Sequence, residues 1–219
     1  MDPDRLASDH AQQRQIHGSL VEVRGLGVLI LGPSGVGKSS IVENLMKSHR
    51  DLIESVSATT RKRRTGERNG RDYFFLSRDQ FRNKKKNREF IETAEIFGEF
   101  YGTPKKPVLE ALSRERTVLF DIDIVGGQAI KRWCKDAVLI FIMPPSLNVL
   151  RKRLVGRKTE SESQVKLRLG RALKEMKVWT KYDYVVCNDD LKRVTALIEN
   201  IIAAESQRVS RNRTIKFTE

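Results

Sequence analysis

Cysteine is scarce in this chain, and long apolar runs are missing from it. The two cysteines, Cys134 and Cys187, lie far apart and outside any Cys-x-x-Cys motif, which indicates neither a zinc site nor a disulfide framework and favours a reducing compartment. No stretch approaches the ~20 apolar residues that a membrane span needs, and residues 1–20 lack the apolar core of a signal peptide. We therefore expect a soluble, cytoplasmic protein.

Acidic residues are too few to balance the basic ones. The 42 Lys and Arg residues outnumber the 28 Asp and Glu residues, so the net charge is +14 and the isoelectric point is near 10.0. A charge of this sign favours an anionic partner, and nucleotides and nucleic acids both qualify. With 219 residues, the chain can bury one sizeable core and carry one or two insertions.

Short apolar runs rich in Val, Ile and Phe recur along the chain, and most of them precede a segment with helical character. Their continuous apolar character predicts strands that are covered on both faces, as in a parallel α/β layer. We expect strands at 28–31, 53–57, 117–120, 138–143 and 184–187, and covering helices at 39–48, 124–134, 146–154 and 191–206.

A phosphate-binding loop follows the first expected strand. Residues 32–39 read GPSGVGKS, which matches the pattern G-x-x-x-x-G-K-[ST]. The glycines allow backbone N–H groups to turn toward one polyphosphate, Lys38 adds a positive charge, and Ser39 offers a hydroxyl to Mg²⁺ at the start of a helix. A glycine-rich turn with a chance lysine is the alternative, but the preceding strand favours nucleotide binding.

Two regions interrupt the α/β pattern. Arginines crowd residues 61–71, and short aromatic segments punctuated by glycine and proline follow, which indicates an inserted lobe. Residues 150–171 are dense in charge and have few apolar side chains. This composition predicts a mobile, solvated element.

The inserted lobe resembles a known family. Residues 57–73, SATTRKRRTGERNGRDY, are similar to the signature S-x-T-T-R-x-x-R-x-G-E-x-x-G-x-D-Y of guanylate kinases. Together with the phosphate loop, the matches extend over about residues 25–206, in the order and spacing of the family. Further matching segments are 89–92 (EFIE), 101–103 (YGT), 121–123 (DID), 156–160 (GRKTE) and 186–189 (VCND).

This resemblance implies a fold and a division of the chain. The fold would be α/β, a P-loop NTPase-type doubly wound parallel sheet of about five strands with an inserted GMP-binding lobe and a mobile lid. Residues 1–24 would be a polar, disordered N-terminal extension, 25–207 the guanylate kinase domain, and 208–219 a basic tail. Within the domain we expect the core at 25–56, 105–150 and 172–207, the lobe at 57–104 and the lid at 151–171.

The resemblance also implies a reaction. A guanylate kinase is an ATP:GMP phosphotransferase, which moves the γ-phosphoryl group of ATP to GMP with Mg²⁺ and yields ADP and GDP in purine metabolism and GMP recycling. Because the acceptor is already a dianion, positioning and electrostatics would carry the catalysis, without a covalent intermediate. The implied partners are ATP and GMP, with no membrane and no obligate nucleic acid, and the chain would be a monomer or a homodimer.

For the acceptor, the resemblance implies an arginine clamp and a base-reading carboxylate. Arg61 and Arg64 would hold the phosphate, since the planar guanidinium fork suits that anion. Glu92 would accept hydrogen bonds from guanine, whereas adenine presents a lone pair at that edge. The implied GMP-binding residues are Ser57, Arg61, Arg64, Glu67, Tyr73, Glu92, Tyr101, Thr103 and Asp121.

For the donor nucleotide, the resemblance implies residues that bind the metal, residues that act in catalysis and residues that bind ATP. Ser39 would bind Mg²⁺, and Asp121 would do so directly or through water, with Asp123 as a lesser contributor; a helix-capping role for either aspartate is the alternative. The implied catalytic residues are Lys38, Arg61, Arg157 and Arg168. The implied ATP-binding residues are Gly32, Pro33, Ser34, Gly35, Val36, Gly37, Lys38, Ser39, Ser40, Arg153 and Asn188.

Two other functions remain open from the sequence. A non-catalytic guanylate-kinase-like module would bind a phosphorylated protein, but such modules typically have a broken phosphate loop, and this loop is intact. Nucleic-acid binding would fit the net charge and the run 84–86, which we interpret instead as a solvated helix face. The resemblance to guanylate kinases is not complete at every position. The residues of this chain that depart from the family pattern are Arg63, Val125 and Lys158.

Overall fold

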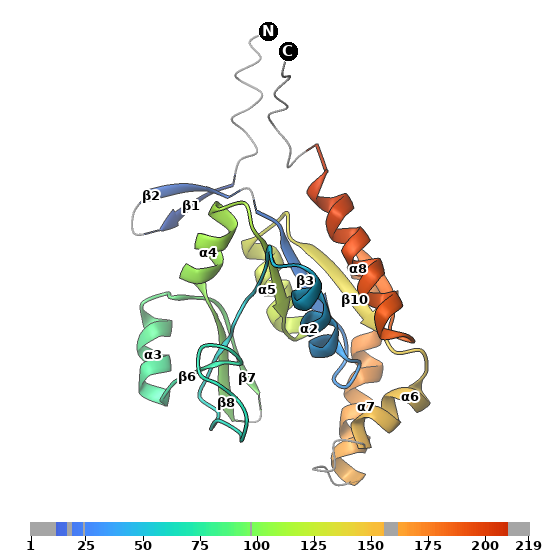
Figure 1. The fold of residues 1–219 in the computed structure, drawn as a ribbon. Coiled ribbons are helices and arrows are strands. Elements are labelled where there is room, and N and C mark those ends of the chain that lie inside the picture. Colours follow the sequence, from blue (N-terminus) through green and yellow to red (C-terminus); the bar gives the residue numbers. More distant parts are fainter. Residues whose placement is uncertain (1–11, 17–18, 24, 97, 156–161, 210–219) are drawn as a thin grey trace, which may run out of the picture.

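The core of the molecule is a five-stranded parallel sheet. A computed structural model describes residues 12–16, 19–23, 25–96, 98–155 and 162–209. The sheet has the order β11-β10-β3-β9-β4, and every neighbouring pair is parallel, so the expected α/β class and strand number are confirmed (Figure 1). The strands are β3 (Gly27–Leu31), β4 (Leu52–Glu54), β9 (Thr117–Asp121), β10 (Val138–Met143) and β11 (Tyr184–Cys187).

Helices cover both faces of this sheet, which explains the continuous apolar runs. On strand β3, Val28 and Ile30 pack into one apolar cluster with helices α2 (Lys38–Ser48) and α8 (Leu191–Ser206). Leu29 and Leu31 point into a second cluster, with α4 (Lys105–Ser113) and α5 (Ile124–Trp133). Because successive strand residues face opposite sides, both sides need apolar cover.

The inserted lobe has its own antiparallel and parallel pairing. Its sheet has the order β6-β5-β8-β7, with strands β5 (Ala58–Thr59), β6 (Phe74–Phe75), β7 (Phe90–Ile96) and β8 (Glu99–Pro104). Helix α3 (Arg78–Lys86) begins at a capping box and buries Phe81, whose ring stacks on Phe90 at 4.6 Å between centroids. Strand β8 runs directly into α4, which connects the lobe to the core.

The charged region at 150–171 is helical wherever it is described. Helix α6 (Leu147–Val155) and helix α7 (Glu162–Met176) pack on each other, through a small cluster of Leu150, Leu154, Val165 and Ala172. The predicted interruption of the regular α/β pattern is therefore wrong for these residues, whereas most of their charged side chains are exposed, as the expected solvated element requires. A short 3₁₀ helix, η1 (Trp179–Lys181), then leads into β11.

The N-terminal extension also contains structure that the sequence analysis did not predict. Strands β1 (Gln12–Ile16) and β2 (Ser19–Val23) pair as an antiparallel hairpin, and β2 contacts α4. The expectation of disorder is wrong for these ten positions. Among the helices of the described residues, none has the length and apolar character required to cross a bilayer.

Candidate functional site

One cavity of about 440 Å³ brings three parts of the fold together at the carboxyl ends of β3 and β9. Its walls come from the phosphate loop, the inserted lobe and helix α7, which surround the lower part of the core in Figure 1. Open parallel sheets place their ligands at this edge. Of the predicted site residues, those lining the cavity are Gly32, Ser34, Gly35, Gly37, Lys38, Ser39, Ser40, Ser57, Arg64, Tyr73, Glu92, Tyr101, Asp121 and Arg168.

The phosphate loop is built on a close backbone approach that only glycine allows. Gly37 precedes α2 with φ at 102°, and a Cβ there would lie 2.6 Å from Asn188 Nδ2. The left-handed backbone and the missing side chain are both needed. Lys38 Nζ donates to the carbonyl oxygen of Gly32 at 3.0 Å, so its ammonium group lies over the loop, where a bound polyphosphate would meet it.

Two residues that were predicted to bind ATP contact the backbone of the phosphate loop from outside the cavity. Asn188, which is buried, donates from Nδ2 to the Val36 carbonyl oxygen at 2.7 Å. Arg153 donates to the same oxygen at 3.0 Å and to the Asn188 carbonyl at 3.1 Å. Neither lines the cavity described above. Their contacts in this structure hold the backbone of the loop.

Ser39 and Asp121 supply the oxygen atoms that a magnesium site requires. The Ser39 hydroxyl, at the start of α2, donates to Asp121 Oδ2 at the end of β9 at 2.7 Å. Within the described part of the chain, no cluster of three or more His, Cys, Asp or Glu side chains could enclose a metal. Mg²⁺ commonly binds one or two protein oxygens and completes its shell with substrate phosphates and water, so these two residues fit that ion.

Arg61 is held by Glu67 in a two-point ion pair. Nη2 donates to Glu67 Oε1 at 2.7 Å and Nη1 to Oε2 at 3.2 Å. Both side chains are largely buried, and the guanidinium lies 5.4 Å from the centre of the Tyr73 ring. The hydrogen bond from Arg61 lowers the pKa of Glu67, and the same bond raises the pKa of Arg61. Glu67 therefore orients an arginine that stays charged.

Arg64 and two tyrosines form the lobe's wall of the cavity. Arg64 is exposed and lines the cavity, and its backbone N–H donates to Glu67 Oε2 at 2.7 Å. The rings of Tyr73 and Tyr101 meet edge to face at 6.1 Å. Burial raises the pKa of Tyr73, so its hydroxyl keeps its proton and can donate a hydrogen bond.

Glu92 lies where β7 meets the start of α5. Thr103, fully buried on β8, donates its hydroxyl to Glu92 Oε1 at 2.7 Å. Burial raises the pKa of Glu92, and the nearby charge of Asp123 raises it further. A Cβ on Gly126 would lie 3.4 Å from Glu92 Oε2, so the glycine leaves room beside that oxygen.

Helix α7 adds two charged side chains to the cavity that were not predicted, Arg171 and Glu175, beside the predicted Arg168. Asp123, which was expected to contribute to the metal site, lines the cavity from the start of α5. A helical pattern was the available signal, because Arg171 and Glu175 are four residues apart and pair at 2.7 Å. Of the predicted lid residues, Arg157 lies outside the described residues.

The remaining predicted residues lie near the cavity without lining it. Arg61 and Glu67 pair with each other, and Thr103 supports Glu92. Pro33 and Val36 belong to the phosphate loop itself, and Arg153 and Asn188 contact that loop from outside.

Comparisons with known proteins agree with this geometry. The guanylate kinase family model matches residues 25–205. The chain is 46% identical over 190 residues to a guanylate kinase of Caulobacter vibrioides, covering 86% of this chain and 89% of that protein. It is 43% identical over 199 residues to one of Clostridioides difficile, covering 90% and 97%.

A solved structure extends the similarity to three dimensions. The crystal structure of guanylate kinase from Anaplasma phagocytophilum superposes with a TM-score of 0.72 at 33% identity, covering 87% of this chain and 91% of that one. The residues that the family model matches include the phosphate loop, the inserted lobe and helices α6 and α7. The chain therefore belongs to the guanylate kinase family.

Proposed function

We propose that this chain transfers the γ-phosphoryl group of ATP to GMP in the presence of Mg²⁺ and releases ADP and GDP. The observation that carries the proposal is the single cavity lined at once by the phosphate loop, by Arg64, Tyr73 and Glu92 of the lobe, and by Arg168 of α7. A transfer between two nucleotides requires both phosphate chains in one space, end to end. We place the reaction in the cytoplasm, in the recycling of GMP.

On the donor side, the phosphate loop would bind the polyphosphate of ATP. Backbone N–H groups and the N-terminus of α2 favour the anion, and Lys38 would neutralise charge near the transferring group. Ser39 and Asp121 would hold Mg²⁺, which neutralises charge on the donor phosphates when it is bound. Arg153 and Asn188 act on ATP through the position of the Val36 carbonyl.

On the acceptor side, the arginines would bind the phosphate of GMP. Arg61 has five N–H donors. Two of them serve Glu67, one serves the Lys62 carbonyl, and the guanidinium also interacts with the Tyr101 hydroxyl. The remaining N–H capacity would serve a phosphate oxygen. Because a carboxylate repels phosphate, Glu67 would not contact GMP directly and would act by positioning Arg61.

The base would be selected at Glu92. With Oε1 engaged by Thr103, the carboxylate can accept from the ring N–H and the exocyclic amine of guanine. Adenine presents a lone pair at the same position and would leave Oε2 of this half-buried carboxylate without a donor from the base, which costs about 1–3 kcal/mol. Ser57 and Tyr101 also line the cavity and would complete the binding of the nucleotide.

The lid would close over the reacting phosphates. We assign Arg168, together with Arg157, to the charge that spreads over the transferred group, since cations there stabilise the transition state more than the ground state. Closure would also exclude water that could otherwise hydrolyse ATP. In this division, residues 151–171 are the lid and residues 57–104 are the GMP-binding lobe.

Substituting Glu92→Gln tests the proposal most directly. We expect kcat/KM for GMP to fall by roughly 100-fold and the preference for GMP over AMP to shrink, because the amide replaces one acceptor with a donor. A coupled assay of ADP formation with GMP and with AMP measures both. The control is Glu95→Gln, an exposed glutamate on the same strand. An unchanged preference for guanine would refute the role of Glu92.

A further inference from the structure

Arg171 joins the lid helix to the acceptor side of the cavity. From α7, its Nη2 lies 3.6 Å from Asp123 Oδ2, and its Nε donates to Glu175 Oε1 at 2.7 Å. The side chain of Arg171 is 51% exposed, whereas those of Asp123 and Glu175 are 26% and 17% exposed. One guanidinium thus bridges two carboxylates from different elements, and it is half-shielded from solvent.

Asp123 connects Arg171 to the GMP side of the cavity, because it caps the N-terminus of helix α5 next to Glu92. Its Oδ1 accepts the N–H of Gly126 at 2.8 Å and caps the helix. A Cβ on Gly126 would lie 3.3 Å from that oxygen and 3.4 Å from Glu92 Oε2, so the two carboxylates flank the same glycine. A cation that contacts Asp123 therefore acts beside the carboxylate assigned to the base.

We infer that Arg171 is a positioning residue that couples the lid to the GMP pocket, by tying α7 to Asp123 at the start of α5. The coupling to GMP rests on the proposed function. With Arg171 in place, α7 is held toward the acceptor side and the negative charge of Asp123 is offset. Without it, α7 loses this link to α5, and two carboxylates face each other across Gly126 with less compensation.

The size of the effect follows from exposure. A partly exposed ion pair contributes little, and the usual range for such pairs corresponds to about a two- to fivefold change in an equilibrium constant. An arginine that contacted the transferred phosphoryl group directly would cost about 100-fold or more on removal. The size of the loss in kcat/KM therefore distinguishes an arginine that positions α7 from one that contacts the transferred phosphoryl group.

The experiment is a double-mutant cycle between Arg171→Gln and Asp123→Asn, with kcat and KM measured for GMP and for ATP. Asparagine keeps the capping oxygen and removes only the charge. We expect Arg171→Gln to lower kcat/KM for GMP two- to fivefold in the native background, and to have little further effect in the Asp123→Asn background. Arg171→Lys should restore part of the loss, and the preference for GMP over AMP should be unchanged.

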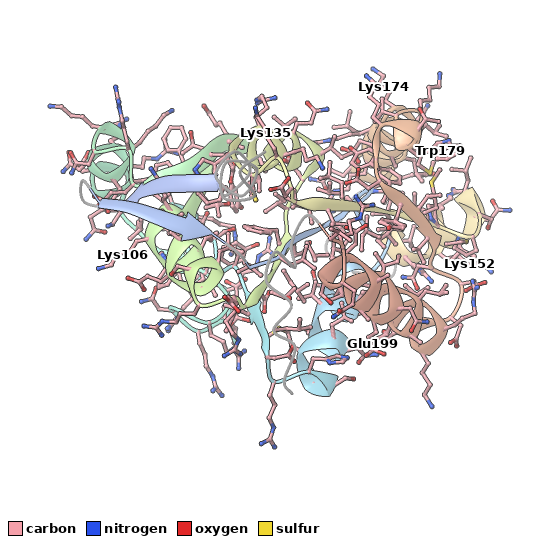
Figure 2. All side chains as sticks on the ribbon, turned by 90° about the horizontal axis from the view of Figure 1, so that it is seen from above. Lys106, Lys135, Lys152, Lys174, Trp179 and Glu199 are labelled. Carbon is pink, nitrogen blue, oxygen red and sulfur yellow. The ribbon has the colours of Figure 1, made fainter. Side chains whose placement is uncertain are left out.

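Lys174→Gln is the matched control, because it removes the same charge from the same helix and its side chain points outward in Figure 2. An equal loss in both backgrounds, a loss matched by Lys174→Gln, or a loss of 100-fold that lysine does not rescue would each overturn the inference. Its failure is distinct from failure of the proposed base reader, which shows in the Glu92→Gln preference and not in this cycle.

Discussion

In the absence of substrate, the ionised carboxylate of Glu92 lowers the free energy of unfolding. Its carboxylate is half-buried between β7 and the start of α5, and desolvation is the main reason that its pKa is raised, followed by the neighbouring charge of Asp123. The hydrogen bond from Thr103 only partly offsets this. Such a group is destabilising where it is ionised, and a bound base with two N–H donors would compensate it.

The pH dependence of the free energy of unfolding should show this destabilisation by Glu92. Because the pKa of Glu92 is higher in the folded state than in the unfolded one, its favourable contribution is present below its ordinary pKa of 4.5 and is lost as the pH rises through the raised value. We expect Glu92→Gln to raise the free energy of unfolding at pH 7 by about 1 kcal/mol, and the gain to disappear toward pH 4.5. Urea unfolding at both pH values measures it.

The same substitution at Glu95, which is exposed on β7, should change stability little at either pH. A Glu92→Gln variant that is less stable than the native protein at pH 7 would contradict the assignment of a destabilising, ionised carboxylate.

The sequence predicts most residues of the cavity but few of their contacts. The segments that resemble the family include Arg64, Tyr73 and Glu92, and all three line the cavity. The sequence could not show that Arg61 pairs with Glu67, because six positions separate them in an irregular loop. The hydrogen bond from Asn188 to Val36 spans 152 positions, and only the tertiary fold brings these two residues together.

At the scale of elements, the phosphate loop depends on a strand end far away in the sequence. Asn188 follows β11, and its backbone N–H donates to the Met143 carbonyl at the end of β10 at 2.8 Å, while its side chain donates to Val36. This places an amide at the rear of the loop, in contact range of Gly37. The loop's geometry is thus fixed from outside the motif.

Replacing Asn188→Ala should therefore affect the donor more than the acceptor. The change removes one of the two donors to the Val36 carbonyl and leaves the bond from Arg153, so it costs about 0.5–1.5 kcal/mol of stability and loosens the loop. We expect KM for ATP to rise several-fold while KM for GMP stays nearly constant. Steady-state kinetics with each nucleotide varied in turn measures the split, and Asn200→Ala on α8, which is exposed, is the control. Equal changes in both KM values would contradict the loop-supporting role.

Helix α7 shows why one element was mispredicted. The high charge of residues 150–171 suggested an interruption of the α/β pattern, yet Val165, Leu169, Ala172 and Met176 recur at intervals of three or four, as expected of one helix face. Val165 and Ala172 are buried against α6. Periodicity was a better guide than composition here, because a helix needs only one apolar stripe and can carry charge around the rest of its surface.

Across the whole molecule, the excess of positive charge has two parts. Some cations line the cavity, such as Lys38, Arg64 and Arg168. Others, including Lys106, Lys135 and Lys152, project from the outer surface in Figure 2. In the proposed function, the first group would neutralise the charge of two nucleotides, whereas the described structure shows no single anionic target for the second group. Net charge alone predicted an anionic partner and could not distinguish these groups.

One titration would test whether the cavity holds both nucleotides at once. A compound that joins adenosine and guanosine through five phosphates should bind one molecule per chain, and more tightly than ATP or GMP alone, because the second nucleotide binds intramolecularly. The matched compound with adenosine at both ends should bind more weakly, since it lacks the contacts of guanine with Glu92. Calorimetry gives stoichiometry and affinity together. Two molecules per chain, or an affinity no better than that of ATP alone, would show that the two nucleotides do not share this cavity.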